Sequence, residues 1–451
     1  MKRTLIISSI VAALGGLLFG FDTAVISGTT DWLQTFFDLS PFELGFTVSS
    51  ALIGTIIGAM FIGPLADRFG RRYILFVLAI LYFVSALGAG LAHNWHTFLI
   101  FRFIGGLGVG GASVVSPMYI AEISPAKYRG RLVAVAQLNI VFGILLAYMS
   151  NYIISTMNLG DWECRWMLLV QALPAVVFFA LLFFTPRSPR WLIANSFVDE
   201  ARGVLEKVGT DSGNIEKEIE DIKASIKTES QKKREPLFIK KYRKLIFLAI
   251  TIAAFNQLSG INAILYYAPN IFTLAGFGKG SALMGSMGVG AVMFIFTIAA
   301  MAVMDSMGRK KIMIIGSIGY IVSLGAITWA FYTNPDPEHF SDAGGMVVLV
   351  GLLLFVAAHG FGQGSVIWVY LSEIFPNKVR GRGQSLGTTT HWLFAATTSW
   401  TFPLMTKYST SGMFLFFTLC MVAQLFWAIF IMPETKNISL EEMQEKLGVT
   451  D

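Results

Sequence analysis

Two oppositely charged residues lie inside apolar stretches, where charged side chains are rare. Asp22 interrupts "LLFGFDTAVISG" (residues 17–28) and Arg102 interrupts "FLIFRFIGG" (residues 98–106). A charge at the centre of a bilayer costs roughly 2.5 to 3.5 kcal/mol, so such residues usually pair inside the protein. We expect Asp22 and Arg102 to pair. Burial alone favours the neutral acid and a nearby guanidinium favours the carboxylate, so a mobile Arg102 would let Asp22 bind and release a proton. A purely structural ion pair is the alternative.

A second set of side chains suits a neutral, hydroxylated solute. Amides, tryptophans and a histidine can hold such a solute by hydrogen bonds and ring stacking. The apolar stretches contain Gln137, Asn256, Gln257, Asn262, Trp368, His391 and Trp392. Polar side chains at membrane depth usually face protein or a cavity, and each of these residues could instead hold helices together.

The elements that must position these residues are membrane-spanning helices. The chain has 451 residues, of which 55% are hydrophobic and 14% charged, with a mean hydropathy of +0.64. This composition indicates a membrane protein. One span takes roughly 20 mostly apolar residues. We predict twelve spans, at 5–28, 44–66, 73–92, 97–121, 132–154, 166–186, 245–272, 281–304, 311–332, 345–372, 383–405 and 412–432. The basic, apolar start is predicted to be an uncleaved first helix.

Positive charge is distributed unevenly between the connecting segments. If both termini are cytoplasmic, the inner segments hold nearly all Lys and Arg, and the outer loops keep only Arg165, Lys279 and Lys407. This asymmetry predicts cytoplasmic termini. It also accounts for the net charge of +6 without nucleic acid. The two cysteines, Cys164 and Cys420, support neither a zinc site nor a disulfide scaffold. We expect no metal and no cofactor.

An internal repeat divides the sequence into two halves of six spans. "ADRFGRR" (66–72) recurs as "MDSMGRKK" (304–311), "EISPAKYRGR" (122–131) recurs as "EIFPNKVRGR" (373–382), and "PRSPR" (186–190) and "PETK" (433–436) close the halves. The predicted parts are an N-terminal six-helix bundle at 1–186, a cytoplasmic amphipathic helical linker at 187–244, a C-terminal six-helix bundle at 245–432 and a cytoplasmic tail at 433–451. Parallel six-helix repeats are typical of transporters that bind substrate between the halves and work by alternating access.

The motifs together carry a family resemblance. They are "GFDTAVISG", "DRFGRR", "RFIGGLGVGGASVVSPMYIAEISP", "QLSGINAILYYAPNIF", "DSMGRKK", "WVYLSEIFP" and "PETK", in this order. The chain resembles a sugar porter of the major facilitator superfamily over essentially its full length. The resemblance implies an all-α membrane protein with twelve helices in two pseudo-symmetric bundles. The run "GGLGVGG" (105–111) follows no predicted strand, so we assign it to helix packing and not to nucleotide binding.

The resemblance also implies roles for particular residues. Sugar contacts fall on Phe19, Gln137, Gln257, Asn262 and Trp368, and an outer gate falls on Tyr266 and Tyr267. Family members with Asp at the position of Asp22 resemble proton symporters, whereas passive facilitators tend to carry Asn. We therefore expect proton symport, with Arg102 switching Asp22, and keep a passive uniporter as the mechanistic alternative.

Several residues depart from the family pattern. Asn256 replaces a Gln, Met293 replaces an Asn of the eighth span, and Arg187 stands where a Glu usually joins a cytoplasmic network. His359 and His391 fall where fructose-selective facilitators resemble a histidine pair, and both can donate or accept hydrogen bonds. Fructose is therefore the expected substrate. Glucose or xylose is the alternative, and the histidines could instead serve packing.

Charged residues also gather at the predicted inner ends of the helices. They are Asp67, Arg71, Glu122, Arg129, Asp305, Arg309, Glu373 and Arg380. Anchoring of topology by positive charge is one interpretation. The resemblance implies a salt-bridge network that locks the inner ends while the site faces outward. Single exposed pairs contribute roughly 0 to 1 kcal/mol, so only a network would bias the conformations.

Other function classes fit the sequence less well. It contains no HExxH motif, so we do not expect an enzyme. A transporter-like sugar sensor typically needs a long signalling tail, and nineteen residues follow Met432. We expect a monomeric sugar transporter of the plasma membrane, with a bacterial inner membrane favoured. Its partners would be a monosaccharide, a proton and the lipid bilayer, and no nucleic acid.

Overall fold

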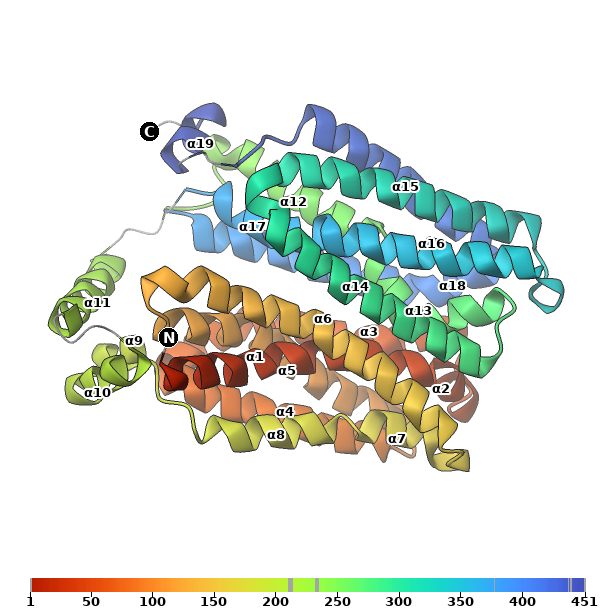
Figure 1. Ribbon diagram of the computed structural model, residues 1–451, viewed down its shortest axis with the longest axis horizontal. Coiled ribbons are helices and arrows are strands. Elements are labelled where there is room, and N and C mark those ends of the chain that lie inside the picture. The colour runs from red at the N-terminus through yellow and green to blue at the C-terminus, as the bar shows by residue number, and fades with distance from the viewer. Residues whose placement is uncertain are drawn as a thin grey trace. The chain divides into compact units, whose positions relative to one another are not determined.

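A computed structural model shows that the described chain is built from helices (Figure 1). The structure describes residues 2–209, 214–231, 235–376, 378–436, 438 and 440–449, and no strand occurs among them. Eleven helical segments of this described part are long and apolar enough to span a membrane. The last, Arg380–Phe430, has 51 residues and a non-helical break at Ser409, and one span takes about 20 residues. It is therefore long enough for two spans, and the predicted twelve-helix membrane fold is confirmed.

Contacts divide the chain into two compact units, which are described separately. Unit 1 consists of Met1–Val25, Ile53–Ala147 and Cys164–Lys233, and unit 2 consists of Ile26–Leu52, Tyr148–Glu163 and Arg234–Asp451. Unit 2 thus includes two segments from the first half of the sequence. The helices α3 (Pro41–Phe69) and α6 (Ala126–Thr156) each begin in one unit and end in the other.

Unit 1 has a layer of long helices and a group of short ones. Its helices, besides the parts of α3 and α6, are α1 (Arg3–Val25), α4 (Arg71–Gly90), α5 (Trp95–Ile123), α7 (Glu163–Leu169), α8 (Ala172–Leu182), α9 (Pro189–Ala194), α10 (Val198–Val208) and α11 (Ile215–Gln231). The helices α1, α4, α5 and α8 pack side by side (Figure 1). Apolar residues of α10 and α11, such as Val204 and Ile219, join the same hydrophobic core.

Glycines set the close packing inside unit 1. A Cβ atom added to Gly110 of α5 would lie 2.1 Å from the backbone oxygen of Thr55 on α3. A Cβ atom on Gly54 of α3 would likewise lie 2.3 Å from the backbone oxygen of Phe103 on α5. Only glycine allows backbones to approach this closely. The structure therefore agrees with the assignment of the glycine run to helix packing.

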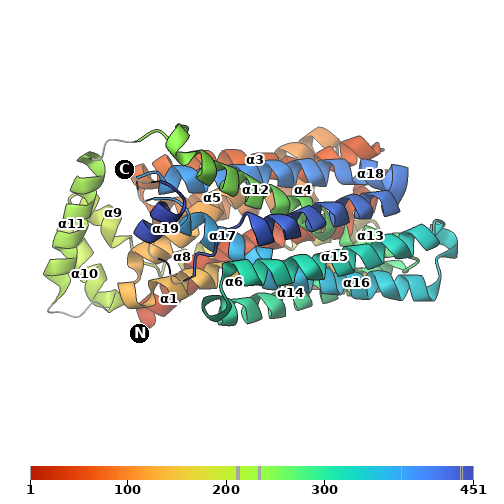
Figure 2. The same cartoon turned by 90° about the horizontal axis from the view of Figure 1, so that it is seen from above.

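Unit 2 contains most of the second half of the sequence. Its elements are η1 (Ile26–Thr29), α2 (Thr30–Phe36), η2 (Gly160–Trp162), η4 (Lys240–Tyr242), α12 (Arg243–Leu258), α13 (Ile261–Leu274), α14 (Lys279–Met307), α15 (Arg309–Thr333), η5 (Pro337–His339), α16 (Asp342–Phe361), α17 (Gln363–Glu373), α18 (Arg380–Phe430) and α19 (Leu440–Lys446). The helix α16 packs against both α14 and α15 (Figure 2).

Two predicted spans of unit 2 are interrupted at glycine. The span predicted at 245–272 breaks at Gly260, between α12 and α13, where φ is +84°. The span predicted at 345–372 breaks at Gly362, between α16 and α17. Discontinuous helices are common at the binding sites of secondary transporters, because a break exposes polar backbone groups. Each break lies a few residues from a predicted sugar contact, Gln257 in α12 and His359 in α16.

The internal repeat is visible in the backbone. Gly70 precedes α4 with φ of +93°, and Gly308 precedes α15 with φ of +87°. This region of conformational space favours glycine. The two glycines occupy equivalent positions in "DRFGRR" and "DSMGRK", so the repeated sequence forms the same sharp turn between two helices in each unit.

Candidate functional site

The structure brings Asp22 and Arg102 together inside unit 1. Nη1 of Arg102, on α5, lies 3.0 Å from Oδ1 of Asp22, on α1. Both residues are buried, with 2% and 1% of their surfaces exposed. Nε and Nη2 of Arg102 have no hydrogen-bond acceptor among the described residues. The guanidinium can therefore make further hydrogen bonds if it moves.

A third residue, which sequence reasoning missed, completes this group. Nε2 of Gln171 donates a hydrogen bond of 3.0 Å to the same Oδ1 atom of Asp22. Gln171 is buried and immediately precedes α8. Both donors stabilise the ionised carboxylate, because a carboxylate only accepts hydrogen bonds.

A glycine of α5 makes room for the carboxylate. A Cβ atom on Gly105 would lie 3.4 Å from Oδ1 of Asp22 and 2.4 Å from Oγ of Ser85 on α4. Gly105 therefore lets α1, α4 and α5 meet around Asp22. The "GG" at 105–106 follows Arg102 by one turn of helix, so one short motif of α5 supplies both the cation and the space.

Unit 2 contains a buried cluster of amides and aromatic rings. Nε2 of Gln257 donates to Oδ1 of Asn256 at 3.0 Å and lies 3.2 Å from Nε2 of His391 on α18. The His391 ring lies 5.0 Å from that of Trp368 on α17 and 4.9 Å from that of Trp392, between ring centroids. Oε1 of Gln257 is buried and accepts no hydrogen bond from the described residues. These side chains offer hydrogen-bond acceptors and ring faces, which suit a neutral polyol.

His359 is held by a neighbouring side chain. Its Nδ1 atom lies 2.6 Å from the hydroxyl oxygen of Tyr320 on α15. Both side chains are buried. One ring nitrogen of His359 is therefore already engaged within the protein, and Nε2 is the nitrogen left to bind a ligand.

The other predicted sugar and gate residues are spread over both units. Phe19 on α1 and Gln137 on α6 are half-buried in unit 1. Asn262 is half-buried at the start of α13 in unit 2. Tyr266 and Tyr267 of α13 are buried, and the Tyr267 ring stacks on Phe402 with centroids 4.7 Å apart. The predicted roles of these residues remain predictions.

A charged network in unit 1 ties α4 to α5. Arg71 lies 2.8 Å from Asp67 and 2.9 Å from Glu122, the latter on α5. Oγ of Ser188, which precedes α9, donates to the same Glu122 carboxylate. The side chain of Arg129 lies outside the described residues. Of the four predicted residues of this half, Arg71 therefore contacts two others, Asp67 and Glu122, directly.

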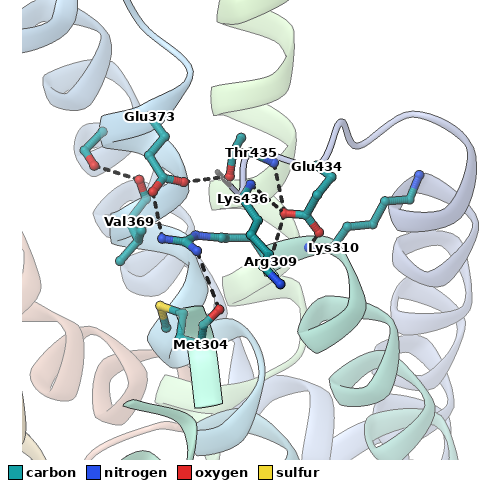
Figure 3. A network of polar contacts seen from close by, with 9 residues as sticks. Met304, Arg309, Lys310, Val369, Glu373, Glu434, Thr435 and Lys436 are labelled. Carbon is teal, nitrogen blue, oxygen red and sulfur yellow. Dashed lines mark hydrogen bonds and ion pairs between the residues drawn. The ribbon is translucent and has the colours of Figure 1, made fainter. Parts of the chain in front are cut away.

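The equivalent network in unit 2 has the same plan (Figure 3). Nη2 of Arg309 donates to Glu373 at 2.9 Å, and Oγ1 of Thr435 donates to the other oxygen of Glu373 at 2.6 Å. Thr435 thus corresponds to Ser188. Nε of Arg380 lies 3.4 Å from the carbonyl oxygen of Phe375, and the side chain of Asp305 lies outside the described part of the chain. The ion pairs described among these residues fall within each unit.

Among the described residues, no group of three or more His, Cys, Asp or Glu side chains is arranged so that it could hold a metal ion.

Comparison with known proteins links this geometry to a family. Residues 8–447 match the model of the family described as "Sugar (and other) transporter". The chain is 39% identical to the D-xylose-proton symporter of Escherichia coli (strain K12), over 97% of this chain and 94% of the relative. It is 37% identical to the arabinose-proton symporter of Bacillus subtilis (strain 168), over 98% and 95%. It is 35% identical to the glucose transport protein of Synechocystis sp. (strain ATCC 27184 / PCC 6803 / Kazusa), over 98% and 97%.

Solved structures of sugar transporters are also similar to this chain. The inward open conformation of the xylose transporter XylE from E. coli has a TM-score of 0.86 and 36% identity, covering 98% of this chain and 99% of that one. The proton:xylose symporter XylE bound to 6-bromo-6-deoxy-D-glucose has a TM-score of 0.78 and 35% identity, covering 98% and 99%. These similarities confirm the predicted superfamily fold and a transporter, not an enzyme.

Proposed function

This chain belongs to the sugar (and other) transporter family, and on that premise we propose that it imports a monosaccharide together with a proton by alternating access. The observation that carries the proposal is the buried pair of Asp22 and Arg102, 3.0 Å apart. A group that only binds sugar has no need of an ionisable residue at this depth. The relatives named as proton symporters of xylose and arabinose support the coupling.

Asp22 is the proton carrier in this mechanism. In the conformation described here, Arg102 and Gln171 both donate to Oδ1 and favour the carboxylate. If Arg102 turns away, its unused Nε and Nη2 atoms can bind other acceptors, and the desolvated carboxylate then favours the protonated acid. We assign the proton to Oδ2, since both donors lie on Oδ1. Return of Arg102 releases the proton.

The proton supplies enough free energy for uphill uptake. One elementary charge moving down a potential of 100 mV releases about 2.3 kcal/mol. Each 1.4 kcal/mol is about a factor of ten in an equilibrium ratio. One proton per sugar would therefore support an inward concentration ratio well above tenfold.

The amide and ring cluster of unit 2 is the proposed sugar-binding group. Gln257 holds Asn256 and His391 within hydrogen-bonding distance, and Trp368 presents a half-buried ring beside His391. A sugar hydroxyl can donate to Oε1 of Gln257, and a sugar ring can stack on Trp368. We retain Phe19, Gln137 and Asn262 as further contacts and Tyr266 and Tyr267 as gate residues, on the family resemblance.

An aldose such as xylose is the first candidate substrate, since the related transporters are named for xylose, arabinose and glucose. The expectation of fructose is not supported by these relatives. It remains the second candidate because His391 lies in the cluster and His359 keeps one ring nitrogen available. Competition for a labelled sugar in proteoliposomes decides between them: better displacement by fructose than by xylose or glucose would reverse this order.

We propose that both chain termini face the cytoplasm of a bacterial cell. Support comes from the concentration of Lys and Arg on the connecting segments of that side. Labelling of single cysteines placed near Lys2 and near Lys446, with a reagent that cannot cross the membrane, tests this orientation in intact cells.

The central test replaces the proton carrier. Asp22→Asn cannot titrate but retains an acceptor for Arg102 and Gln171. We expect this variant to lose accumulation of sugar against a gradient, while exchange of labelled for unlabelled sugar continues. Asp161→Asn, at an exposed position, serves as the matched control and should accumulate sugar normally. Uphill accumulation by Asp22→Asn would place proton coupling elsewhere.

A further inference from the structure

Tyr320 lies between the two helix breaks of unit 2. It belongs to α15 and is fully buried. Its hydroxyl oxygen lies 2.6 Å from Nδ1 of His359, in the last turn of α16 before the break at Gly362. The same hydroxyl is hydrogen-bonded with the side chain of Ser259, which follows α12 and precedes the break at Gly260. One hydroxyl group therefore connects both interrupted helices.

The hydrogen of the Ser259 hydroxyl is already used elsewhere. Oγ of Ser259 donates to the carbonyl oxygen of Asn256 at 2.6 Å, and a carbonyl oxygen can only accept. The backbone N–H of Ile261 donates to the same Oγ at 3.3 Å. A serine hydroxyl has a single hydrogen to donate. Oγ of Ser259 is therefore an acceptor toward Tyr320, and Tyr320 supplies the hydrogen of that bond.

This order of donors determines which nitrogen of His359 carries the proton. The Tyr320 hydroxyl also has one hydrogen, which it gives to Ser259. Its oxygen then accepts from Nδ1 of His359, so Nδ1 carries a hydrogen. In a neutral imidazole only one nitrogen is a donor, and the partner of one nitrogen fixes the state of the other. Nε2 of His359 is thus a hydrogen-bond acceptor.

The helix α15 holds this arrangement in place through a second buried contact. Oγ of Ser317, about one turn before Tyr320, accepts from Nε2 of Gln424 at 2.9 Å. Oε1 of Gln424 accepts in turn from Nε2 of Gln363, the first residue of α17. All four side chains are fully buried. The polar face of α15 therefore contacts the end of α16 directly and the start of α17 through Gln424, which keeps the Tyr320 hydroxyl at a fixed place beside the break at Gly362.

Nε2 of His359 lies toward the proposed sugar-binding cluster. A Cβ atom on Gly364 of α17 would lie 2.9 Å from this nitrogen, so glycine leaves room for the imidazole there. Gly364 and Trp368 are four residues apart and share one face of α17. The Trp368 ring lies 5.0 Å from that of His391, between ring centroids. Nε2 of His359 therefore lies on the face of α17 that carries the tryptophan of the cluster.

We propose that Tyr320 is a positioning residue: together with Ser259 it keeps the proton of His359 on Nδ1, so that Nε2 accepts a hydrogen bond from a hydroxyl group of the bound sugar. This role, which rests on the proposed sugar-binding function of unit 2, makes the site selective for a hydroxyl that can donate. A sugar analogue with hydrogen or fluorine at that position cannot donate, and it leaves Nε2 without a partner.

The position of the proton can be measured without any sugar. Nitrogen NMR of the full-length chain in lipid bilayers, with isotope-labelled histidine, gives separate signals for protonated and unprotonated ring nitrogens. We expect Nδ1 of His359 to be protonated and Nε2 unprotonated, and His359→Gln identifies these signals by removing them. Ser259→Ala leaves the Tyr320 hydrogen available to Nδ1, so the proton of His359 should move to Nε2. Tyr332→Phe, at an exposed place on the same helix, should leave the His359 signals unchanged.

Competition against labelled D-xylose in proteoliposomes then tests the contact with sugar. In the wild-type chain, one deoxyfluoro analogue of xylose should compete at least about fivefold more weakly than xylose itself, because its fluorine cannot donate to Nε2. In Ser259→Ala and Tyr320→Phe this ratio should fall at that ring position alone, since Nε2 can then carry a hydrogen. A purely structural role of Tyr320 would weaken xylose and every analogue together.

Each outcome decides a separate point. A protonated Nε2 of His359 in the wild-type chain would overturn the proposal, and so would unchanged ratios at every ring position in both variants. Ser259→Ala removes a single oxygen, so it still gives a result if Tyr320→Phe does not fold. If the proton lies on Nδ1 but the wild-type chain takes up neither xylose nor any other sugar offered, the proposed function fails while the position of the proton is confirmed.

Discussion

Gln171 is the residue most directly able to tune the proposed proton carrier, Asp22. Its Nε2 atom donates 3.0 Å to Oδ1 of Asp22, the same oxygen that Arg102 contacts. A hydrogen bond to the charged form of an acid favours that form. Loss of Gln171 should therefore weaken the stabilisation of the charged carboxylate of Asp22 relative to its neutral form.

We predict that Gln171→Met shifts the pH dependence of sugar uptake toward higher pH while sugar exchange at neutral pH persists. The removed hydrogen bond is one to a charged group and is worth about 1.5 to 3 kcal/mol. Uptake rates in proteoliposomes measured from pH 5 to pH 9 give the profile. Gln34→Met, half-buried on α2, is the matched control. An unchanged profile would show that Gln171 does not tune proton transfer.

The carboxyl group of Glu434 should make the stability of the folded chain depend on pH. Partial burial acts to raise its pKa, but the N–H groups of Lys436, Arg309, Lys310 and Thr435 together outweigh burial and hold the pKa below the ordinary value of 4.5. A carboxyl whose pKa is lower in the folded chain stabilises the fold above its unfolded pKa, and this stabilisation is lost as the pH falls through the folded pKa.

Glu434→Gln should accordingly lower the unfolding temperature at neutral pH, and the difference from the wild type should narrow as the pH falls below 4.5. Thermal unfolding in detergent between pH 3 and pH 7 measures this. Glu445→Gln, at an exposed position of α19, should show no such dependence. A constant difference between Glu434→Gln and the wild type across this range would contradict the argument.

At the residue scale, charge was the feature of the sequence that best predicted which side chains contact each other. Asp22 and Arg102 could be paired from the sequence because two opposite charges in apolar spans have few other ways to offset desolvation. The contact of Gln171 with Asp22 could not be predicted. Gln171 is one of several amides in the predicted spans, and it has no charge that would indicate a partner. The role of Ser188 became visible only once folding placed its hydroxyl beside Glu122, 66 positions away in the sequence.

At the scale of helices, glycine positions set how closely elements approach. Gly110 faces the backbone of α3, and a Cβ atom there would lie 2.1 Å from the oxygen of Thr55 and 2.6 Å from the nitrogen of Ala59. Backbone cannot move aside as a flexible side chain can. Gly63, on the same α3 helix, would meet nothing within 4 Å.

We predict that Gly110→Ala forces α3 and α5 apart and destabilises the chain by about 1 to 3 kcal/mol, as overpacking usually does. Gly63→Ala should be neutral or slightly stabilising, because alanine is the better helix former. The unfolding temperatures of the two variants in one detergent make the comparison. Equal stability of both variants would mean that the helices can separate without cost.

The element scale also shows which boundaries the sequence can predict. The repeated "DRFGRR" and "DSMGRK" motifs place a turn at Gly70 and at Gly308, and both glycines have positive φ. The breaks at Gly260 and Gly362 were not predicted, because a single glycine in an apolar run is compatible with a continuous membrane helix. Tertiary packing decides which glycines interrupt a helix.

At the scale of the whole molecule, unit 2 joins chain segments from both halves of the repeat. Oγ1 of Thr30 donates to Oδ1 of Asn270 at 2.7 Å, and Nδ2 of Asn270 donates to the carboxylate of Asp31. Lys279 lies 2.9 Å from Glu163. Thr30, Asp31 and Glu163 come from the first half of the sequence, and Asn270 and Lys279 come from the second. Alternating access requires such contacts to break and form again.

Asn270 holds two of these contacts, so Asn270→Ala should release α2 from α13. The lost hydrogen bonds are worth about 1 to 3 kcal/mol, which corresponds to about a 5- to 150-fold change in the ratio of two conformations. Spin labels on Gln34 and Gly280, in a background with Cys164→Ser and Cys420→Ser, should report a larger share of long distances. Asn195→Ala, at the end of α9 in unit 1, should leave the distances unchanged. If Asn270→Ala also leaves them unchanged, these contacts do not hold the two segments together, and the remaining contacts must be tested in combination.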